Sequence, residues 1–386
     1  INVFVNLFIG VSLGTNVLAA RCYAAGKDKE MSEVVHTSIL FALISGIVMA
    51  IIGVLLAKPA LQLMQTPADV IDQSALYMRI YFLGMPFFML YNYGAAVLRA
   101  VGDTKRPLMY LILSGIVNTL LNLFLVIVFR LAVAGVAIST IIAQCISCIL
   151  ILNCLRKSES SYKLTFSGLS IKWVYLRQIF QVGIPAGIQS TVINFSNALL
   201  QSSVNSFGST AMAGYTAANN ILGFLYASVN AVTQACMSFT SQNFGVGKYK
   251  RVDLVLRDCM ILTVGVSLVL GGGAYLFGNE VLRIYTNDSE VVRCGVEILS
   301  ITTVPYFLCG IMDLFPGSLR GMGYSTVPMI LSVVGTVGMR IFWIYRVFPF
   351  HRSLYVLFIS YPASWTFTII MQVICFICVR KIVNRR

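Results

Sequence analysis

The chain has 386 residues, of which 58% are hydrophobic and only 11% are charged, and its mean hydropathy is +0.84. A soluble globular protein of this length does not have such a composition, so we expect the chain to cross a membrane several times. The net charge of +14 is accompanied by no nucleic-acid-binding motif, and we interpret it as a mark of membrane topology and of contact with anionic lipid.

Apolar stretches long enough to span a bilayer follow one another along almost the whole chain. A bilayer core needs about 20 apolar residues in one helix, and the sequence predicts eleven such helices. They lie near residues 1–24, 34–57, 76–98, 107–129, 133–155, 178–205, 211–245, 256–278, 295–319, 326–348 and 354–379. The predicted fold class is therefore an all-α polytopic membrane protein.

Lysine and arginine residues indicate which loops face the cytoplasm. Twenty of the 28 lie in alternate loops and in the C-terminal tail, seven lie on the opposite side, and Arg340 lies inside a helix. The positive-inside rule makes the side with twenty basic residues cytoplasmic. We therefore predict a cytoplasmic C-terminus.

The sequence repeats itself at one fixed offset of 221 residues. Residues that match across this offset include Gly26 with Gly247, Lys27 with Lys248, Leu98 with Leu319, Arg99 with Arg320, Gly102 with Gly323 and Pro107 with Pro328. The chain is thus predicted to contain two copies of one unit. The expected parts are an N-terminal lobe at 1–155, a cytoplasmic linker at 156–177 and a C-terminal lobe at 178–386.

The helix near 178–205 has no counterpart in the first half, because Ile1 is equivalent to Leu222 at this offset. We therefore expect one further helix before residue 1, so that the N-terminal lobe lacks its first helix and eleven of twelve helices are present. Six helices in each half make the repeats parallel, related by an axis along the membrane normal. Two related halves that enclose a central site are typical of membrane transporters.

Residues for enzyme chemistry are scarce. The two histidines, His36 and His351, lie near opposite membrane faces, and Cys375 and Cys378 form a C-x-x-C within a lipid-length helix. Neither arrangement favours a zinc site, and no P-loop glycine pattern is present. An intramembrane enzyme would need a clustered nucleophile or metal set, so we predict no catalytic residue, no cofactor and no enzyme activity.

Asp313 is the strongest candidate for a functional residue inside the membrane. It lies within the apolar stretch 295–319, whereas nearly every other carboxylate falls in a loop or at a helix end. A carboxylate is costly in such a place, and it could bind and release a proton or ligate Na⁺ together with nearby carbonyl groups. The alternative is a structural pair with Arg340 in the next helix, because intramembrane charges often pair.

Two rows of neutral polar side chains accompany this carboxylate. The long row is spaced by 4, 3, 4 and 4 residues, which places its members on one helical face: Ser190, Asn194, Asn197, Gln201 and Asn205. The short row, in the first half, comprises Ser114, Asn118 and Asn122. Such donors and acceptors suit the lining of a wet cavity, and hydrogen bonding between helices is the alternative.

Arg99 and Arg320 precede Gly102 and Gly323 at helix ends that the charge distribution places on the cytoplasmic side. Arginine can interact there with terminal carbonyl groups, and glycine can end a helix. We interpret both segments as structural.

Several stretches resemble one known family. They are GIPAGIQS at 183–190, VNSFGSTAMAGYTAANNI at 204–221, SFTSQNFGVGKYKRV at 238–252, and the pair LRAVGDTKRP at 98–107 and LRGMGYSTVP at 319–328. Together they are similar to the multidrug and toxic compound extrusion (MATE) transporters, in particular their bacterial DinF-like branch. The resemblance implies two six-helix lobes around a V-shaped cavity, in a functional monomer of the bacterial inner membrane. It also implies alternating-access export of small organic, often cationic, compounds in exchange for H⁺ or Na⁺.

The resemblance also bears on single residues. Asp313 matches the family's acidic position six residues before the Leu of Leu-Arg-Gly, which implies a cation or proton site there. The NorM-like branch has a glutamate in its seventh helix, where this chain has Ile193 and Asn194. The closest alternative function is a lipid-linked oligosaccharide flippase of related architecture. That function would favour a strongly cationic cavity, yet nearly all lysines and arginines here lie in predicted loops.

Overall fold

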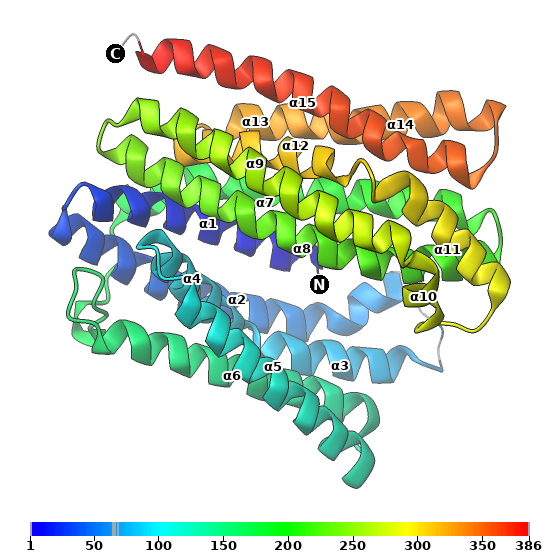
Figure 1. Cartoon of the computed structure of the whole chain (residues 1–386). Coiled ribbons are helices and arrows are strands. Elements are labelled where there is room, and N and C mark those ends of the chain that lie inside the picture. Colours follow the sequence, from blue (N-terminus) through cyan, green and yellow to red (C-terminus); the bar gives the residue numbers. More distant parts are fainter. Residues whose placement is uncertain (1, 64–66, 68, 385–386) are drawn as a thin grey trace. The chain divides into compact units, whose positions relative to one another are not determined.

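The computed structural model describes residues 2–63, 67 and 69–384, and over these residues the fold is helical with connecting turns (Figure 1). Arg385 and Arg386, which were counted on the basic side, lie outside the described residues, as does Ile1. The helices form two compact units. We call Ser12–Phe180 the N-terminal unit, and Gln181–Arg386 together with Ile1–Val11 the C-terminal unit.

The N-terminal unit begins within the first helix and ends within the seventh. Its helices are α1 (Asn2–Ala24), α2 (Asp28–Leu63), α3 (Ile71–Leu83), α4 (Met85–Ala100), α5 (Lys105–Leu123), a π-helical segment (Phe124–Val128), α6 (Ala132–Lys157), a short 3₁₀ helix (Phe166–Gly168) and the start of α7 (Trp173–Asn205). Within this unit α4 packs against α2 and α6.

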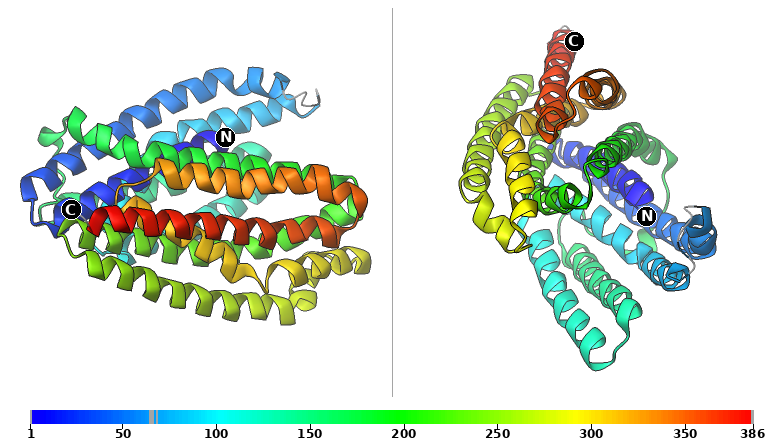
Figure 2. Two further views of the ribbon diagram at one scale, coloured as in Figure 1. Left: turned by 90° about the horizontal axis from the view of Figure 1, so that it is seen from above. Right: turned by 90° about the vertical axis from the view of Figure 1, so that its right-hand side faces the viewer.

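The C-terminal unit contains most of α7 and all later elements. These are α8 (Ser209–Gly245), α9 (Tyr249–Leu276), α10 (Gly278–Arg283), α11 (Ser289–Thr302), α12 (Tyr306–Gly321), α13 (Thr326–Ser332), α14 (Met339–Phe342) between two π-helical segments (Val333–Gly338 and Trp343–Val347), a 3₁₀ helix (Phe348–Phe350) and α15 (Leu354–Asn384). Here α12 packs against α8, α9 and α15. Figure 2 shows the segment from α13 to α14 running beside α15.

Eight helical segments are individually long and apolar enough to cross a membrane, and the number rises to ten if each bent pair counts as one span. The bent pairs are α3 with α4, at 43°, and α11 with α12, at 51°. The eleventh predicted span is α7, which has 33 residues and is about 50 Å long. This helix is long enough to cross a membrane but less apolar than the other ten spans, because its amide and hydroxyl side chains lower its hydropathy.

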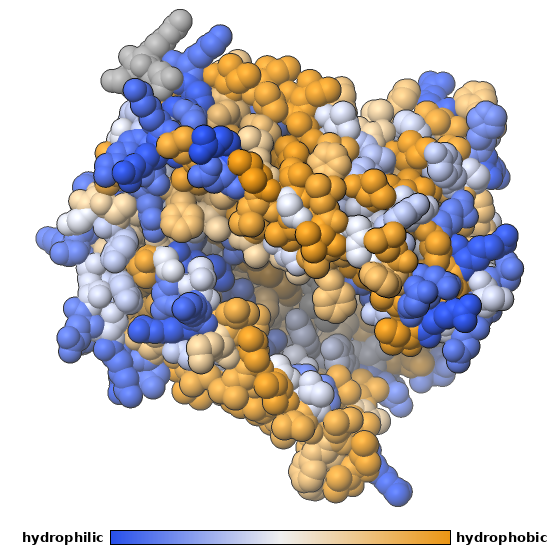
Figure 3. All heavy atoms as spheres, in the orientation of Figure 1, coloured by the Kyte–Doolittle hydropathy of each residue, from blue (hydrophilic) through white to orange (hydrophobic). Residues whose placement is uncertain are grey.

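The surface agrees with a lipid environment. On the face that Figure 3 shows, apolar side chains cover most of the middle of the molecule, and hydrophilic ones gather mainly at its left and right sides, where most of the helices end. On α5, Leu108, Leu111 and Ile112 are more than half exposed. Only 6% of the most apolar 18 residues between Lys105 and Val128 is buried. A helix that is apolar on its exposed side needs lipid to cover it.

Helix boundaries follow the offset of 221 residues that the sequence predicts. Residues 85–100 of α4 correspond to residues 306–321, which are the limits of α12, and the start of α5 at Lys105 corresponds to the start of α13 at Thr326. The turns also agree: φ is +64° at Gly26 and +70° at Gly247, and +90° at Gly102 and +88° at Gly323. The two copies therefore share a backbone plan as well as residues.

The predicted linker at 156–177 is attached to α2 within the N-terminal unit. The Thr165 backbone N–H donates to His36 Nε2 at 3.1 Å, and Thr37 Oγ1 donates to the Ser170 carbonyl at 3.2 Å. His36 Nδ1 lies 2.7 Å from the Ser32 carbonyl oxygen, to which it donates, while Nε2 accepts from Thr165. His36 thus has a structural task.

Candidate functional site

Asp313 lies on α12, about two turns after the bend from α11, and its side chain is partly exposed. It interacts electrostatically with Arg320 on the same helix and with Tyr226 on α8, whose side chain is 46% exposed. Over the described residues, no hydrogen bond or ion pair within 4 Å engages the Asp313 carboxylate. Its oxygens are therefore available to a proton or a cation.

Arg320 was expected to interact with the carbonyl groups at the end of its helix, but it contacts a side chain on α7. Its side chain is only 9% exposed, and one terminal nitrogen donates to Gln189 Oε1 on α7 at 2.5 Å. Sequence analysis missed Gln189, because this residue lies off the face that carries the long polar row. Its hydrogen bond to Arg320 connects α12 to α7 about two turns after Asp313.

Arg340 does not pair with Asp313 in the part of the chain that the structure describes. Its Nη1 donates to Asn197 Oδ1 at 2.7 Å, and its guanidinium lies 4.3 Å from the centre of the Tyr361 ring. The structure therefore does not contain the ion pair between Asp313 and Arg340 that was the alternative interpretation of this carboxylate. Arg340 contacts Asn197 and Tyr361, whereas Asp313 interacts with Arg320 and Tyr226.

The long polar row occupies one face of α7. Ser190, Asn194, Gln201 and Asn205 are exposed, and Asn197 is half-buried against Arg340. Ser190 donates to the Ala186 carbonyl of its own helix at 3.2 Å. The face is therefore accessible, and the lining of a cavity by these residues stays a prediction.

The short row connects two helices of the N-terminal unit. Asn122 donates to Asn118 Oδ1 at 2.9 Å, and Asn118 donates to Thr140 Oγ1 on α6 at 3.4 Å. Ser139 Oγ, also on α6, donates to Asn122 Oδ1. These bonds between α5 and α6 correspond to the alternative that the sequence left open for this row.

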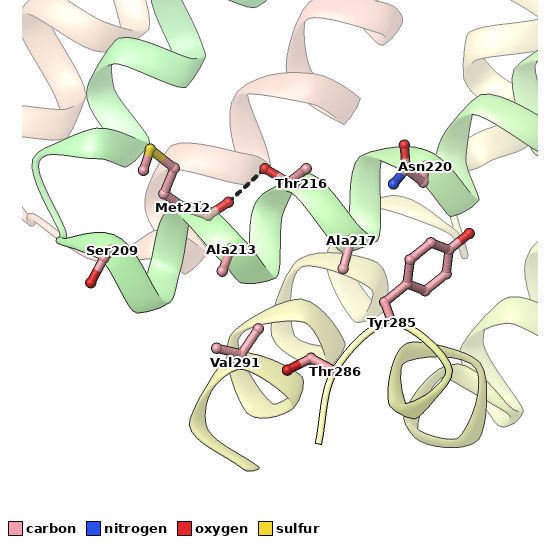
Figure 4. Close-up of a pocket in the computed structure, with 9 residues that line it drawn as sticks. All are labelled: Ser209, Met212, Ala213, Thr216, Ala217, Asn220, Tyr285, Thr286 and Val291. Carbon is pink, nitrogen blue, oxygen red and sulfur yellow. Dashed lines mark hydrogen bonds between the residues drawn. The ribbon is translucent and has the colours of Figure 1, made fainter. Parts of the chain in front are cut away.

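A surface pocket of about 430 Å³ lies at the N-terminal end of α8 (Figure 4). Thr216 and Asn220 line it from α8, and Tyr285 and Thr286 line it from the turn between α10 and α11. Thr216 Oγ1 donates to the Met212 carbonyl at 2.8 Å, and Met212, Ala213 and Ala217 make the rest of the wall on α8 largely apolar and uncharged. No pattern along the chain predicted that residues 285 and 286 lie opposite Asn220.

Metal ligands are not gathered anywhere in the described part of the chain: no group of three or more His, Cys, Asp or Glu side chains there could hold a metal ion. A cation at Asp313 would therefore have one carboxylate and neutral oxygen ligands. That set suits a weakly held, exchangeable ion better than a resident one.

A duplicated helical fold, bent spans and a partly exposed carboxylate within an apolar helix define a multi-pass membrane transporter. The sequence profile of the MatE family matches residues 1–124 and 185–345. The chain therefore belongs to the MatE family of multidrug efflux transporters.

Curated relatives of bacterial origin agree with this assignment. The chain is 27% identical over 378 residues to the probable multidrug resistance protein YoeA of Bacillus subtilis, which covers 95% of this chain and 81% of the relative. It is 30% identical over 343 residues to the probable multidrug resistance protein YpnP of the same organism, with 88% and 75% covered. The multidrug export protein MepA of Staphylococcus aureus is 24% identical over 334 residues, with 85% and 72% covered.

Solved structures share the fold at low sequence identity. A crystal structure of MATE in complex with MaL6 superposes with a TM-score of 0.94 at 18% identity, covering 100% of this chain and 87% of that chain. An outward-facing multidrug resistance MATE transporter of the MOP superfamily gives a TM-score of 0.91 at 17% identity, covering 100% and 86%. The fold class predicted from the sequence is thus confirmed.

Proposed function

We propose that the protein is a secondary antiporter that exports small organic, often cationic, compounds in exchange for H⁺ or Na⁺. The observation that carries this proposal is the partly exposed Asp313 carboxylate, which has no ion-pair partner within 4 Å among the described residues. The names of the bacterial relatives, which refer to multidrug resistance and export, support the substrate class. The protein would act as a monomer in the bacterial cytoplasmic membrane, with its C-terminus in the cytoplasm.

Coupling in this proposal comes from differential binding. Asp313 would bind H⁺ or Na⁺ when the site faces outwards and release it when the site faces the cytoplasm. A conformational equilibrium shifts only as far as a ligand binds one state better than the other. The exposed polar face of α7 would line the path, because neutral amides can solvate varied compounds without demanding one charge pattern.

The test is ethidium efflux from proteoliposomes that contain the complete protein, under an imposed proton or sodium gradient. We expect Asp313→Asn to lower gradient-driven efflux by at least about tenfold, since loss of a titratable ligand removes an interaction on which coupling depends. Asp258→Asn is the matched control, because this carboxylate is exposed on α9 and, among the described residues, its ion pair is with its neighbour Arg257. That variant should transport like the wild type.

Two outcomes would contradict the proposal at different levels. Efflux that is unchanged in Asp313→Asn would make this residue structural and leave antiport to another site. Wild-type protein that moves no ethidium with either gradient would count against drug antiport itself, and transport of a lipid-linked oligosaccharide would then be measured.

A further inference from the structure

Four large apolar side chains are exposed between residues 166 and 174, on the connection from α6 to α7. The exposed fractions are 60% for Phe166, 40% for Ile171, 67% for Trp173 and 66% for Val174, and we call these four residues the linker patch. The rest of the described chain leaves them uncovered. A group of apolar side chains in this state indicates a surface that something outside the chain covers.

Hydrogen bonds to α2 hold this connection in place. The Thr165 backbone N–H donates to His36 Nε2 at 3.1 Å, and the Lys172 backbone N–H donates to Thr37 Oγ1 at 3.1 Å. The Leu164 side chain, at the start of the same segment, is fully buried. The segment thus has a fixed conformation, so presenting the linker patch to a partner costs little conformational entropy.

The residues that anchor the connection place the linker patch at the boundary of the membrane. His36 and Thr37 are the third and fourth residues of the predicted apolar span 34–57, so the connection lies level with the start of that span. Trp173 begins α7, five residues before the predicted apolar stretch 178–205, which is about 7.5 Å along the helix. The headgroup region on each side of the hydrocarbon core is about 5–8 Å thick. Trp173 therefore lies at the depth of the headgroups, where tryptophan is enriched in membrane proteins.

Positive charge accompanies the linker patch along the chain. Between residues 156 and 177 there are five basic residues and one acidic residue, Glu159. The basic residues are Arg156, Lys157, Lys163, Lys172 and Arg177. All five are exposed, and no ion pair within 4 Å engages any of them in the part of the chain that the structure describes. Basic side chains beside an exposed apolar surface attract anionic phospholipids, so charge and depth agree on the same partner.

We propose that the linker patch binds anionic phospholipids of the leaflet at this end of the molecule, which the charge distribution predicts to be the cytoplasmic leaflet. Phe166 and Trp173 insert their rings among the headgroups, and Lys163 and Lys172 contact lipid phosphates through charge-assisted hydrogen bonds. A lipid surface fits this site better than a soluble protein does, because a protein would have to displace headgroups at the depth of Trp173. The attachment fixes the depth of the connection and, through its hydrogen bonds, that of the start of α2.

The test measures which lipid lies against Trp173. The complete protein is reconstituted in nanodiscs that contain phosphatidylcholine and phosphatidylglycerol in equal amounts. One lipid or the other has bromine on the upper part of its acyl chains, because bromine quenches tryptophan fluorescence only at contact range. The chain has three tryptophans, so the Trp173 signal is the difference between each protein and the same protein with Trp173→Phe. We expect brominated phosphatidylglycerol to quench Trp173 at least about twofold more than brominated phosphatidylcholine, since the basic residues attract the anionic lipid.

Two double variants separate this site from a general effect of surface charge. Lys163→Gln together with Lys172→Gln should lower the quenching ratio towards one, because the attraction to the anionic headgroup is weakened while the apolar residues stay in place. Lys248→Gln together with Lys250→Gln is the matched control, because it removes the same charge from exposed positions at the start of α9. The ratio in this control should stay at the wild-type value.

Three outcomes would overturn the proposal. Equal quenching of the wild type by the two lipids would show that the linker patch does not select anionic phospholipid. Equal losses of the ratio in the two double variants would make any selection a property of the whole charged surface. Quenching of Trp173 by aqueous iodide but by neither lipid would show that the linker patch is open to water and to a soluble protein partner.

Discussion

The two repeats share helix boundaries and turn geometry but differ in their intramembrane chemistry. Position 313 is aspartate in the C-terminal unit, and its equivalent in the N-terminal unit is Asn92, which donates to the Phe88 carbonyl of its own helix at 2.8 Å. The equivalent of Arg340 is Thr119, which donates to the Gly115 carbonyl at 3.1 Å. Duplication has preserved the backbone, while at these two positions a charged side chain is present in the C-terminal copy and a neutral one in the N-terminal copy.

The largest effect is expected from moving the carboxylate between repeats. The double variant Asp313→Asn with Asn92→Asp keeps the number of acidic groups, yet we expect its gradient-driven ethidium efflux to stay at least about tenfold below wild type. The reason is that Tyr226, which interacts with Asp313, has the apolar Val5 as its equivalent. Recovery of wild-type efflux in proteoliposomes would mean that the repeats are chemically interchangeable.

A smaller effect is expected on stability, at the crossing of α2 with α4 and at the equivalent crossing of α9 with α12. A Cβ atom at Gly46 of α2 would lie 2.5 Å from the Pro86 Cα atom of α4, whereas a Cβ at Gly310 of α12 would meet the Thr263 methyl group of α9. Backbone cannot move aside without separating the helices, so Gly46→Ala should cost about 1–3 kcal/mol of unfolding free energy and Gly310→Ala less. Melting temperatures of the two variants in detergent micelles test this prediction. A lower melting temperature for Gly310→Ala than for Gly46→Ala would contradict it.

The smallest difference is expected at the paired turns. Gly102 and Gly323 have φ of +90° and +88°, and a Cβ atom added at Gly102 would meet nothing within 4 Å. Alanine at either position should lower stability through backbone strain, by about 1–2 kcal/mol and equally in the two repeats. Gly115→Ala, in a helix with open space around it, is the control and should be neutral or stabilising. Unequal melting temperatures for the two turn variants would show that the repeats have diverged in backbone as well.

Sequence patterns predicted the features that depend on neighbours along the chain. The spans follow from apolar length, the repeat from matching residues, and Asp313 from its isolation within an apolar run. The partners of the buried arginines were not predictable in this way, because Gln189 lies 131 residues from Arg320 and Asn197 lies 143 residues from Arg340. Helical periodicity placed Asn197 on a polar face, but only packing in three dimensions brings it to a cation.

The turns between paired helices also constrain how the protein is made. Only Ala25, Gly26 and Lys27 join α1 to α2, and residues 246–248 join α8 to α9. Because only three residues separate the two helices of each pair, the helices emerge from the ribosome in direct succession. Each pair can therefore enter the bilayer as one hairpin rather than as two independent segments. An insertion error would then reverse both helices at once, so each short turn helps to set the orientation of a whole hairpin.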